Sequence, residues 1–231
     1  MPEAFATPVS RRQTIATLGA GVAGLALAAP ARAFAPATSG DGAAGADALL
    51  TSIADNLLAH SPEGATSLGI DTGARAAMRA QLGDRSAAGQ QALAATLKAD
   101  LARVRAFDTA GLDHATRTSL AVVDSAYDVA LAGFVQPYGD VAVGGWRNTP
   151  YVVIQNVGAY LDVPKFLDSD HPVKTSADAE AYLARLAAYP AALDGETERL
   201  KAAAAQGLIA PAFLIDKAVK QMEASLADAR D

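Results

Sequence analysis

The sequence predicts a mainly α-helical, bundle-like domain with one irregular or short-strand insertion at about residues 138–173. Composition supports this fold class, because alanine is abundant and aromatic residues make up only 6% of the 231 residues. Spacing supports it as well, since large apolar residues recur at intervals of three and four. The hydrophobic content of 51% is enough to bury the core of a globular domain.

Helix-start and helix-stop signals divide the chain into six expected helices. They cover residues 47–60, a short segment from Ser61, residues 86–107, residues 114–134, a long segment from Thr175 to about Leu200, and a last segment from Pro211. Asp113 is placed to cap the fourth of these helices. Thr175 and Asp178 resemble a capping box in which Asp replaces the usual Glu. Pro190 lies inside the long segment, where we expect a kink or a break.

Three of these segments have an apolar face that we expect to be buried. The faces are Leu93, Leu97, Leu101 and Val104; then Tyr182, Leu186, Tyr189, Leu193 and Leu200; and finally Ile215, Val219, Met222 and Leu226. Charged residues of the first segment, including Asp100, lie largely off its apolar face. We therefore expect these charged side chains to be exposed.

The first 33 residues have the order of a twin-arginine export signal. Arg11 and Arg12 precede an uncharged, weakly apolar run over residues 14–30, and Ala31 and Ala33 flank a small-residue cleavage site. The run contains few large side chains, whereas a stable membrane anchor needs about 20 strongly apolar residues. We expect the export machinery to recognise this signal and to deliver a periplasmic or secreted protein.

The residues after the predicted cleavage site have the composition of a flexible linker. Pro, Gly, Ser and Ala dominate residues 34–45, which show no periodic apolar face. The predicted organisation is therefore a signal peptide over residues 1–33, a linker over residues 34–45 and a helical domain over residues 46–231.

Three glycines in the export signal also spell G-x-G-x-x-G, the fingerprint of a dinucleotide site. The glycines are Gly19, Gly21 and Gly24. A true site needs a strand before the fingerprint, a helix after it and an acidic residue about 20 positions later. Asp41 has this spacing but lies in the expected linker. We therefore interpret the glycines as part of the export signal and rank a dinucleotide oxidoreductase last among the possible functions.

Charge and motif content exclude several function classes. The net charge is −6 and no stretch gathers Lys and Arg into a patch, so nucleic acid is not an expected partner. The absence of Cys excludes disulfides, thiolate catalysis and Cys-based zinc sites. The sequence motifs of esterase elbows, phosphate loops and H-E-x-x-H metallopeptidases are also absent. We predict no catalytic residue, no metal ligand and no cofactor in this chain.

Polar and aromatic groups are concentrated in residues 140–172. The candidate substrate-binding residues there are Trp146, Arg147, Asn148, Tyr151 and Gln155. A ring, a fixed positive charge and side-chain amides could orient a peptide-like group by stacking and hydrogen bonding. Alternatively, this segment is a structured loop whose rings fill the end of the bundle and whose amides satisfy buried backbone groups.

The three histidines do not suggest a metal site. Asp168, Asp170 and His171 are close in sequence, but residues on one turn rarely converge on a single ion. His60 and His114 each stand at a helix boundary, where capping or an interaction with the helix dipole explains them.

Several stretches resemble the N-terminal half of the bacterial family called domain of unknown function 885. The stretches cover residues 61–71, 138–173, 178–200 and 207–222. Their most specific part is a Y-x-V-x-Q-like core followed by a P-x-F-L-x-x-x-H-P run, here Tyr151, Val153, Gln155, Pro164, Phe166, Leu167, His171 and Pro172.

The resemblance implies a function that this chain lacks the residues to perform alone. Members of the family are usually longer, mostly helical and often exported, and an H-E-x-x-x-x-H-like zinc motif in their C-terminal half makes them resemble metallopeptidases. That motif is absent here, so zinc is expected only in full-length relatives.

Two hypotheses follow, and whether the chain is an enzyme stays open. In the first, the chain is the exported N-terminal part of a zinc-metallopeptidase-like hydrolase. It is inactive alone and forms a wall of a cleft for a peptide-like substrate with the missing C-terminal half. In the alternative, it is a stand-alone periplasmic helical module that binds a peptide or a partner protein.

Overall fold

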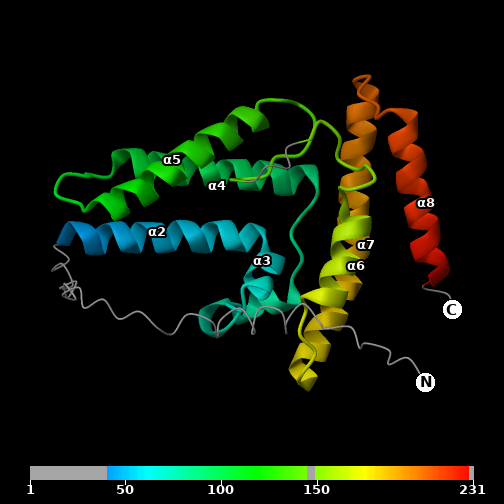
Figure 1. Ribbon diagram of the computed structural model, residues 1–231, viewed down its shortest axis with the longest axis horizontal. Helices are drawn as coiled ribbons and strands as arrows, with labels where there is room; N and C mark the ends of the chain where they lie inside the picture. Colours follow the sequence, from blue (N-terminus) through cyan, green and yellow to red (C-terminus); the bar gives the residue numbers. More distant parts are fainter. Residues whose placement is uncertain (1–40, 145–148, 229–231) are drawn as a thin grey trace, which may run out of the picture. The chain divides into compact units, whose positions relative to one another are not determined.

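The computed structural model describes residues 41–144 and 149–228, most of which form helices (Figure 1). The elements are α2 (Asp41–His60), α3 (Pro62–Ser67), the 3₁₀-helix η1 (Gly73–Ala80), α4 (Ala87–Ala106), α5 (His114–Phe134), α6 (Ala159–Ser169), α7 (Ser176–Ala205) and α8 (Ala212–Asp228). In these two ranges the backbone forms isolated bridges but no strand. The predicted mainly α fold is therefore confirmed.

Helices α4, α5 and α7 each begin after a residue whose side chain caps the helix, and the caps at Asp113 and Thr175 were predicted. The Ser86 hydroxyl accepts a hydrogen bond from the Gly89 N–H at 3.1 Å, and the Asp113 carboxylate accepts one from the Thr116 N–H at 3.0 Å. Thr175 and Asp178 form the reciprocal capping box at the start of α7. These side chains satisfy N–H groups that have no partner within the helix.

Helix α2 begins earlier than the sequence predicted. It starts at Asp41, so residues 41–45 of the predicted linker over residues 34–45 are helical, and that boundary was wrong. Ala46, Leu49 and Ile53 pack into the core one and two turns later, and this packing stabilises the added helical turn. Residues 34–40 lie outside the described ranges.

The insertion predicted at residues 138–173 as irregular or short-stranded contains isolated bridges and a helix. Asp140 pairs with Thr149 and Ile154 with Val157 as isolated antiparallel bridges. Helix α6, which contains Pro164, was not predicted. Burial of its apolar face outweighs the hydrogen bond that Pro164 cannot donate. Pro190 likewise does not break α7, which runs as one element.

The first core lies between α2, α4 and α5, which contact one another pairwise. Leu97, with 0% exposure, is at its centre. Asp100 is also buried there, contrary to the sequence prediction, because Asn56 and Arg103 donate hydrogen bonds to its carboxylate at 3.0 and 2.8 Å. Burial, together with the Asp100 charge, raises the pKa of the neighbouring Tyr127 to about 12.

The second core joins α6 to α7. Its members are Ala159, Val163, Phe166, Leu167 and Ala192, with Tyr182, Tyr189 and Leu193 packed against them. Leu186 and Leu200 share the sequence spacing of this face but are 45% and 42% exposed, so the predicted buried face of α7 is only partly buried.

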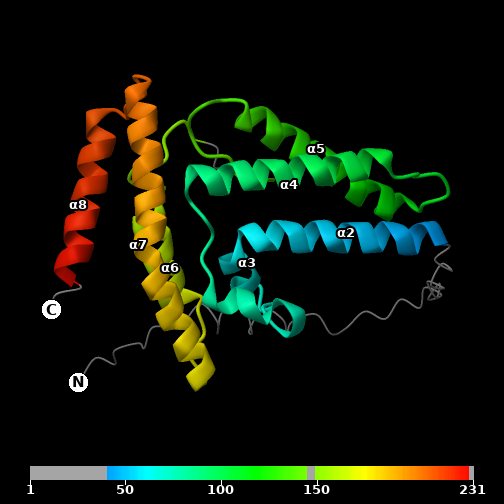
Figure 2. The same ribbon diagram turned by 180° about the vertical axis from the view of Figure 1, so that it is seen from behind.

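Helix α8 lies alongside α7 in both ribbon views (Figures 1 and 2). Its position and spacing match the prediction, but Ala218 is its only buried residue among positions 212–228. No helix of the described residues is long and apolar enough to span a membrane.

Candidate functional site

Two of the five predicted binding residues, Tyr151 and Gln155, lie in the described ranges. Their side chains have different surroundings. Tyr151 lines an apolar groove, whereas the Gln155 side-chain oxygen is buried with no hydrogen-bond partner among the described residues. Trp146, Arg147 and Asn148 lie outside the described ranges, as do the predicted export residues Arg11, Arg12, Ala31 and Ala33 and the glycines Gly19, Gly21 and Gly24.

The segment that carries Tyr151 and Gln155 ends in an anchored helix start. Gly158 has a φ of 134°, a conformation that residues with a Cβ rarely adopt. The next residue, Ala159, donates its N–H to the buried Glu196 carboxylate at 2.7 Å. Arg85 holds the other Glu196 oxygen at 2.9 Å. This charge-assisted arrangement fixes where the segment joins α6.

Arg199 on α7 holds the preceding turn, and sequence reasoning missed it. Its guanidinium donates to the Gly139 carbonyl at 2.7 Å, the Asp140 carboxylate at 2.8 Å and the Arg85 carbonyl at 3.2 Å. The Arg199 side chain is 9% exposed. Periodicity gave no signal for it, because a charged residue on a long helix is usually solvated.

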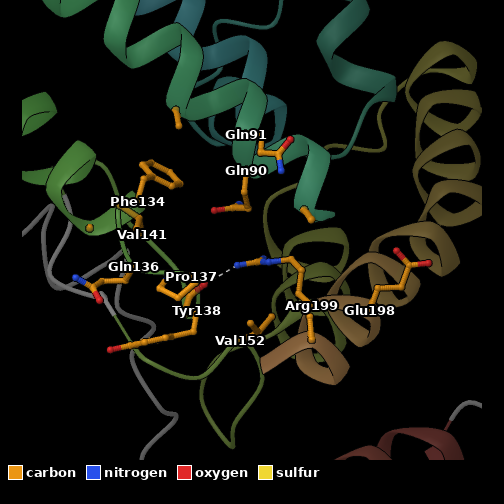
Figure 3. Close-up of a pocket in the computed structure, with 15 residues that line it drawn as sticks. Gln90, Gln91, Phe134, Gln136, Pro137, Tyr138, Val141, Val152, Glu198 and Arg199 are labelled. Atoms are coloured by element: carbon orange, nitrogen blue, oxygen red, sulfur yellow. Dashed lines mark hydrogen bonds between the residues drawn. The ribbon is translucent and has the colours of Figure 1, made fainter. Parts of the chain in front are cut away.

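Arg199 also faces a cavity of about 480 Å³, which we call the α4–α7 pocket (Figure 3). The first turns of α4, the end of α5, the turn over residues 136–141 and the second half of α7 line it. Its volume lies in the range of small-molecule sites. Figure 3 shows Gln90 and the Arg199 guanidinium on opposite sides of the space, with Phe134 and Val141 at one side.

The second hollow is an apolar groove of about 220 Å³, which we call the α7–α8 groove. Its walls are Pro150, Tyr151, Val152 and Val153 from the loop, Leu200, Ala203 and Ala204 from α7, Leu208, Ile209 and Ala210 from the turn, and Ile215, Ala218, Val219 and Met222 from α8. None of these walls carries a charge. Val152 lines both this groove and the α4–α7 pocket, so one loop separates the two hollows.

A buried polar cluster lies at the opposite end of α7, around the fully buried Arg185. We call Arg185, His171, Thr66, Asp71, Arg79 and Asp178 the Arg185 cluster. The Arg185 guanidinium donates to His171 Nδ1 and to the Thr66 hydroxyl at 2.8 Å each, and to the Gln81 and Met78 carbonyls at 2.8 and 2.9 Å. It also lies 4.7 Å from the centre of the Phe166 ring, a cation–π contact.

The rest of the Arg185 cluster is an ion-pair chain. Arg79 donates two hydrogen bonds to Asp71, at 2.9 and 3.0 Å, and one to Asp178 at 2.5 Å. The hydrogen bond from Arg79, aided by the Thr66 hydroxyl, lowers the pKa of Asp71 from its ordinary value. Burial lowers the pKa of Arg185 from its ordinary value. These contacts tie α3, η1 and α7 together.

The Arg185 cluster gives a packing role to residues of two family-like stretches. Thr66 and Asp71 come from the stretch over residues 61–71, and Phe166 and His171 come from the P-x-F-L-x-x-x-H-P run. His171 is buried, and its Nε2 donates to the Asp178 carbonyl at 3.0 Å while Nδ1 accepts from Arg185. Both ring nitrogens are therefore occupied inside the protein.

The donor groups in the described ranges do not fit a zinc ion. His60 pairs with the Thr96 hydroxyl at 2.9 Å, His114 with the Thr118 hydroxyl at 3.1 Å, and His171 is held as described. No group of three His, Asp or Glu side chains in the described part of the chain is arranged to hold a metal ion. A catalytic zinc site needs three such ligands and an open position.

Comparison with solved structures gives a fold match. The crystal structure of "the putative lipoprotein from Colwellia psychrerythraea" matches with a TM-score of 0.65 and 20% identity, over 78% of this chain and 30% of that chain. This chain thus spans less than a third of the length of that protein. No curated protein matches the sequence.

Comparison with family profiles gives a match over most of the chain. Residues 62–231 match the family described as "Bacterial protein of unknown function (DUF885)". The match includes α3 to α8, which carry the second core and the α4 and α5 residues of the first core. The chain belongs to this family.

Proposed function

We propose that this chain is an exported, noncatalytic N-terminal part of a zinc-metallopeptidase-like hydrolase, and that its α7–α8 groove packs against the portion that carries the zinc motif. The observation that carries the proposal is the uncovered apolar face of α8. The paired Arg11 and Arg12 and the small residues Ala31 and Ala33 support export.

The α8 face consists of Ile215, Val219, Met222 and Leu226, which are 37–53% exposed. Their 4-3-4 spacing is that of a helix seam that packs against another helix. Phe213, which is 60% exposed, adds to the same helix, and the groove beside it has no charged wall. A contiguous apolar surface of this kind is typical of an interface.

The remaining portion of a longer family protein is the partner that fits this face. The chain spans 30% of the solved neighbour's length, so most of that protein has no counterpart here. Helix α8 lies at the end of the described residues, beside α7. A segment that continues the fold would therefore reach the α7–α8 groove without crossing the Arg185 cluster.

We assign the zinc-dependent chemistry to the portion that carries the zinc motif, because the described residues of this chain offer no free set of metal ligands. The three histidines are hydrogen-bonded to protein groups, and the carboxylates of the Arg185 cluster are ion-paired. The candidate contacts for a peptide-like substrate are Arg147, Asn148, Tyr151 and Gln155. Tyr151 supports this assignment because it lines the α7–α8 groove, whereas the Gln155 oxygen is buried.

The second candidate is a stand-alone periplasmic module that binds a peptide or a partner protein. The observation that favours it is the completeness of the Arg185 cluster and of the two cores, which need no further segment. This module would use the α7–α8 groove for its partner and would remain without hydrolytic activity.

The coding DNA beyond codon 231 tests the proposal. A reading frame there, in phase or adjacent, should encode a helix with an H-E-x-x-x-x-H-like motif. Co-expression of that product with the full chain should give a complex, and Met222→Lys should disrupt it while the neighbouring Glu223→Lys does not. A DNA sequence without such a frame, or two products that remain separate, contradicts the proposal.

A further inference from the structure

We propose that the α4–α7 pocket binds a neutral carboxamide group, such as the acetamide of an N-acetylated sugar or the amide of a short peptide. This inference is independent of the proposed packing at the α7–α8 groove, because it uses a different hollow that shares only Val152 with the groove. It rests on a matched set of donors, acceptors and apolar walls.

The first step is that the pocket has unused hydrogen-bonding groups. Gln90 and Gln91 line it from α4, and their side-chain amides make no hydrogen bond with another described residue. Arg199 faces them, with a side chain that is more than nine-tenths buried. Its guanidinium carries more N–H donors than its three contacts with the turn over residues 136–141 and with Arg85 require.

The second step is that the pocket favours a neutral ligand. The Arg199 charge is already balanced by Asp140 at 2.8 Å, so a carboxylate ligand would add uncompensated negative charge beside Asp140. The Glu198 carboxylate lines the pocket's edge and is directed away from the Arg199 guanidinium (Figure 3). A cation would be repelled by the Arg199 guanidinium, whose partner Asp140 is already ion-paired.

The third step is the fit of an amide to these groups. A carbonyl oxygen accepts from Arg199 or from the Gln91 amide, and an amide N–H donates to the Gln90 oxygen. The methyl or methylene beside the amide then lies against Phe134, Val141 and Val152. One small group uses both kinds of polar partner and the apolar wall, which is the usual composition of a small-molecule site.

The experiment measures binding of four probes to the full chain by saturation-transfer NMR and by titration. N-acetylglucosamine and N-acetylalanine methylamide carry the amide, and the tighter of the two identifies the source. Glucose lacks the amide and acetate carries a charge, so neither should bind. The Gln90→Leu variant should bind the better amide probe about tenfold more weakly. Lys98→Leu, an exposed change on the same helix, should bind it like the unmodified chain.

Several outcomes overturn the inference. Neither amide probe binds, glucose competes as well as N-acetylglucosamine, acetate alone binds, or Gln90→Leu binds as tightly as Lys98→Leu. Thermal unfolding of both variants confirms that the comparison is made between folded proteins. Because α8 is untouched in these variants, a failure here leaves the test of the proposed function unaffected.

Discussion

The two halves of α7 differ in how completely other parts of the chain cover their side chains. At its first half, Arg185 is 0% exposed and every polar partner of the Arg185 cluster comes from the chain itself. At its second half, Leu200 is 42% exposed and faces an apolar groove that α8 leaves open. The first half of α7 is thus fully packed by the chain itself, whereas the second half keeps an exposed apolar surface. This difference indicates where an additional segment packs.

The largest expected effect is at Arg185. Arg185→Ala leaves His171 Nδ1, the Thr66 hydroxyl and the backbone carbonyls without their donor, so the free energy of unfolding should fall by about 3–5 kcal/mol. Urea unfolding measures the loss. Arg117→Ala, at an exposed position of α5, is the control and should change it by less than about 0.5 kcal/mol. A loss below about 1 kcal/mol at Arg185 contradicts the account.

A smaller effect with a pH signature is expected at Asp71. Its pKa is lower in the folded state than in the unfolded chain, so its stabilising contribution is present at neutral pH and is lost as the pH falls below about 4. Asp71→Asn should cost about 1–3 kcal/mol at pH 7, and the difference from the unmodified chain should narrow toward pH 3. Denaturant unfolding at both pH values measures this. The prediction is wrong if the difference in the free energy of unfolding is the same at both pH values. It is also wrong if Asp216→Asn, on the exposed surface of α8, shows the same narrowing.

The capping box of α7 should contribute about 1 kcal/mol. Thr175→Ala removes the acceptor for the Asp178 N–H, so thermal unfolding should show a loss of about 0.5–2 kcal/mol. Thr72 precedes η1 with the same extended backbone but makes no side-chain capping bond. Equal losses for Thr175→Ala and Thr72→Ala would show that the capping contact is not the cause.

The smallest effect on stability is expected on the α8 face. Met222 is 37% exposed, so Met222→Lys should change the free energy of unfolding by less than about 0.5 kcal/mol. The same change should lower the binding of a hydrophobic dye, whereas Glu223→Lys should not. A loss of more than about 2 kcal/mol would mean that α8 is packed as tightly as the first half of α7.

Local signals predicted more of this molecule than long-range ones. The caps at Asp113 and Thr175 depend on residues three positions apart and were confirmed. Asp100 and Glu196 were not foreseen as buried, because their partners lie 44 and 111 residues away in Asn56 and Arg85. Helical spacing assigns charged residues to solvent unless such partners are known.

The candidate site shows the same limit. The sequence singled out the loop that carries Tyr151 and Gln155, and Tyr151 does line a hollow. It did not identify Arg199, Gln90 or the open groove, because each depends on how α4, α7 and α8 meet. His171 of the P-x-F-L-x-x-x-H-P run was interpreted as part of a turn, whereas its contacts with Arg185 and the Asp178 carbonyl are those of a buried packing residue.

Hydrogen–deuterium exchange of the full chain tests the central claim most directly. If α7 is self-contained at its start and incomplete at its end, amides near Arg185 should exchange slowly and those of α8 should exchange within the fastest class of helical amides. Adding the product of the downstream reading frame should then slow exchange in α8 and leave the amides near Arg185 unchanged. Exchange in α8 as slow as near Arg185 in the chain alone would contradict the account.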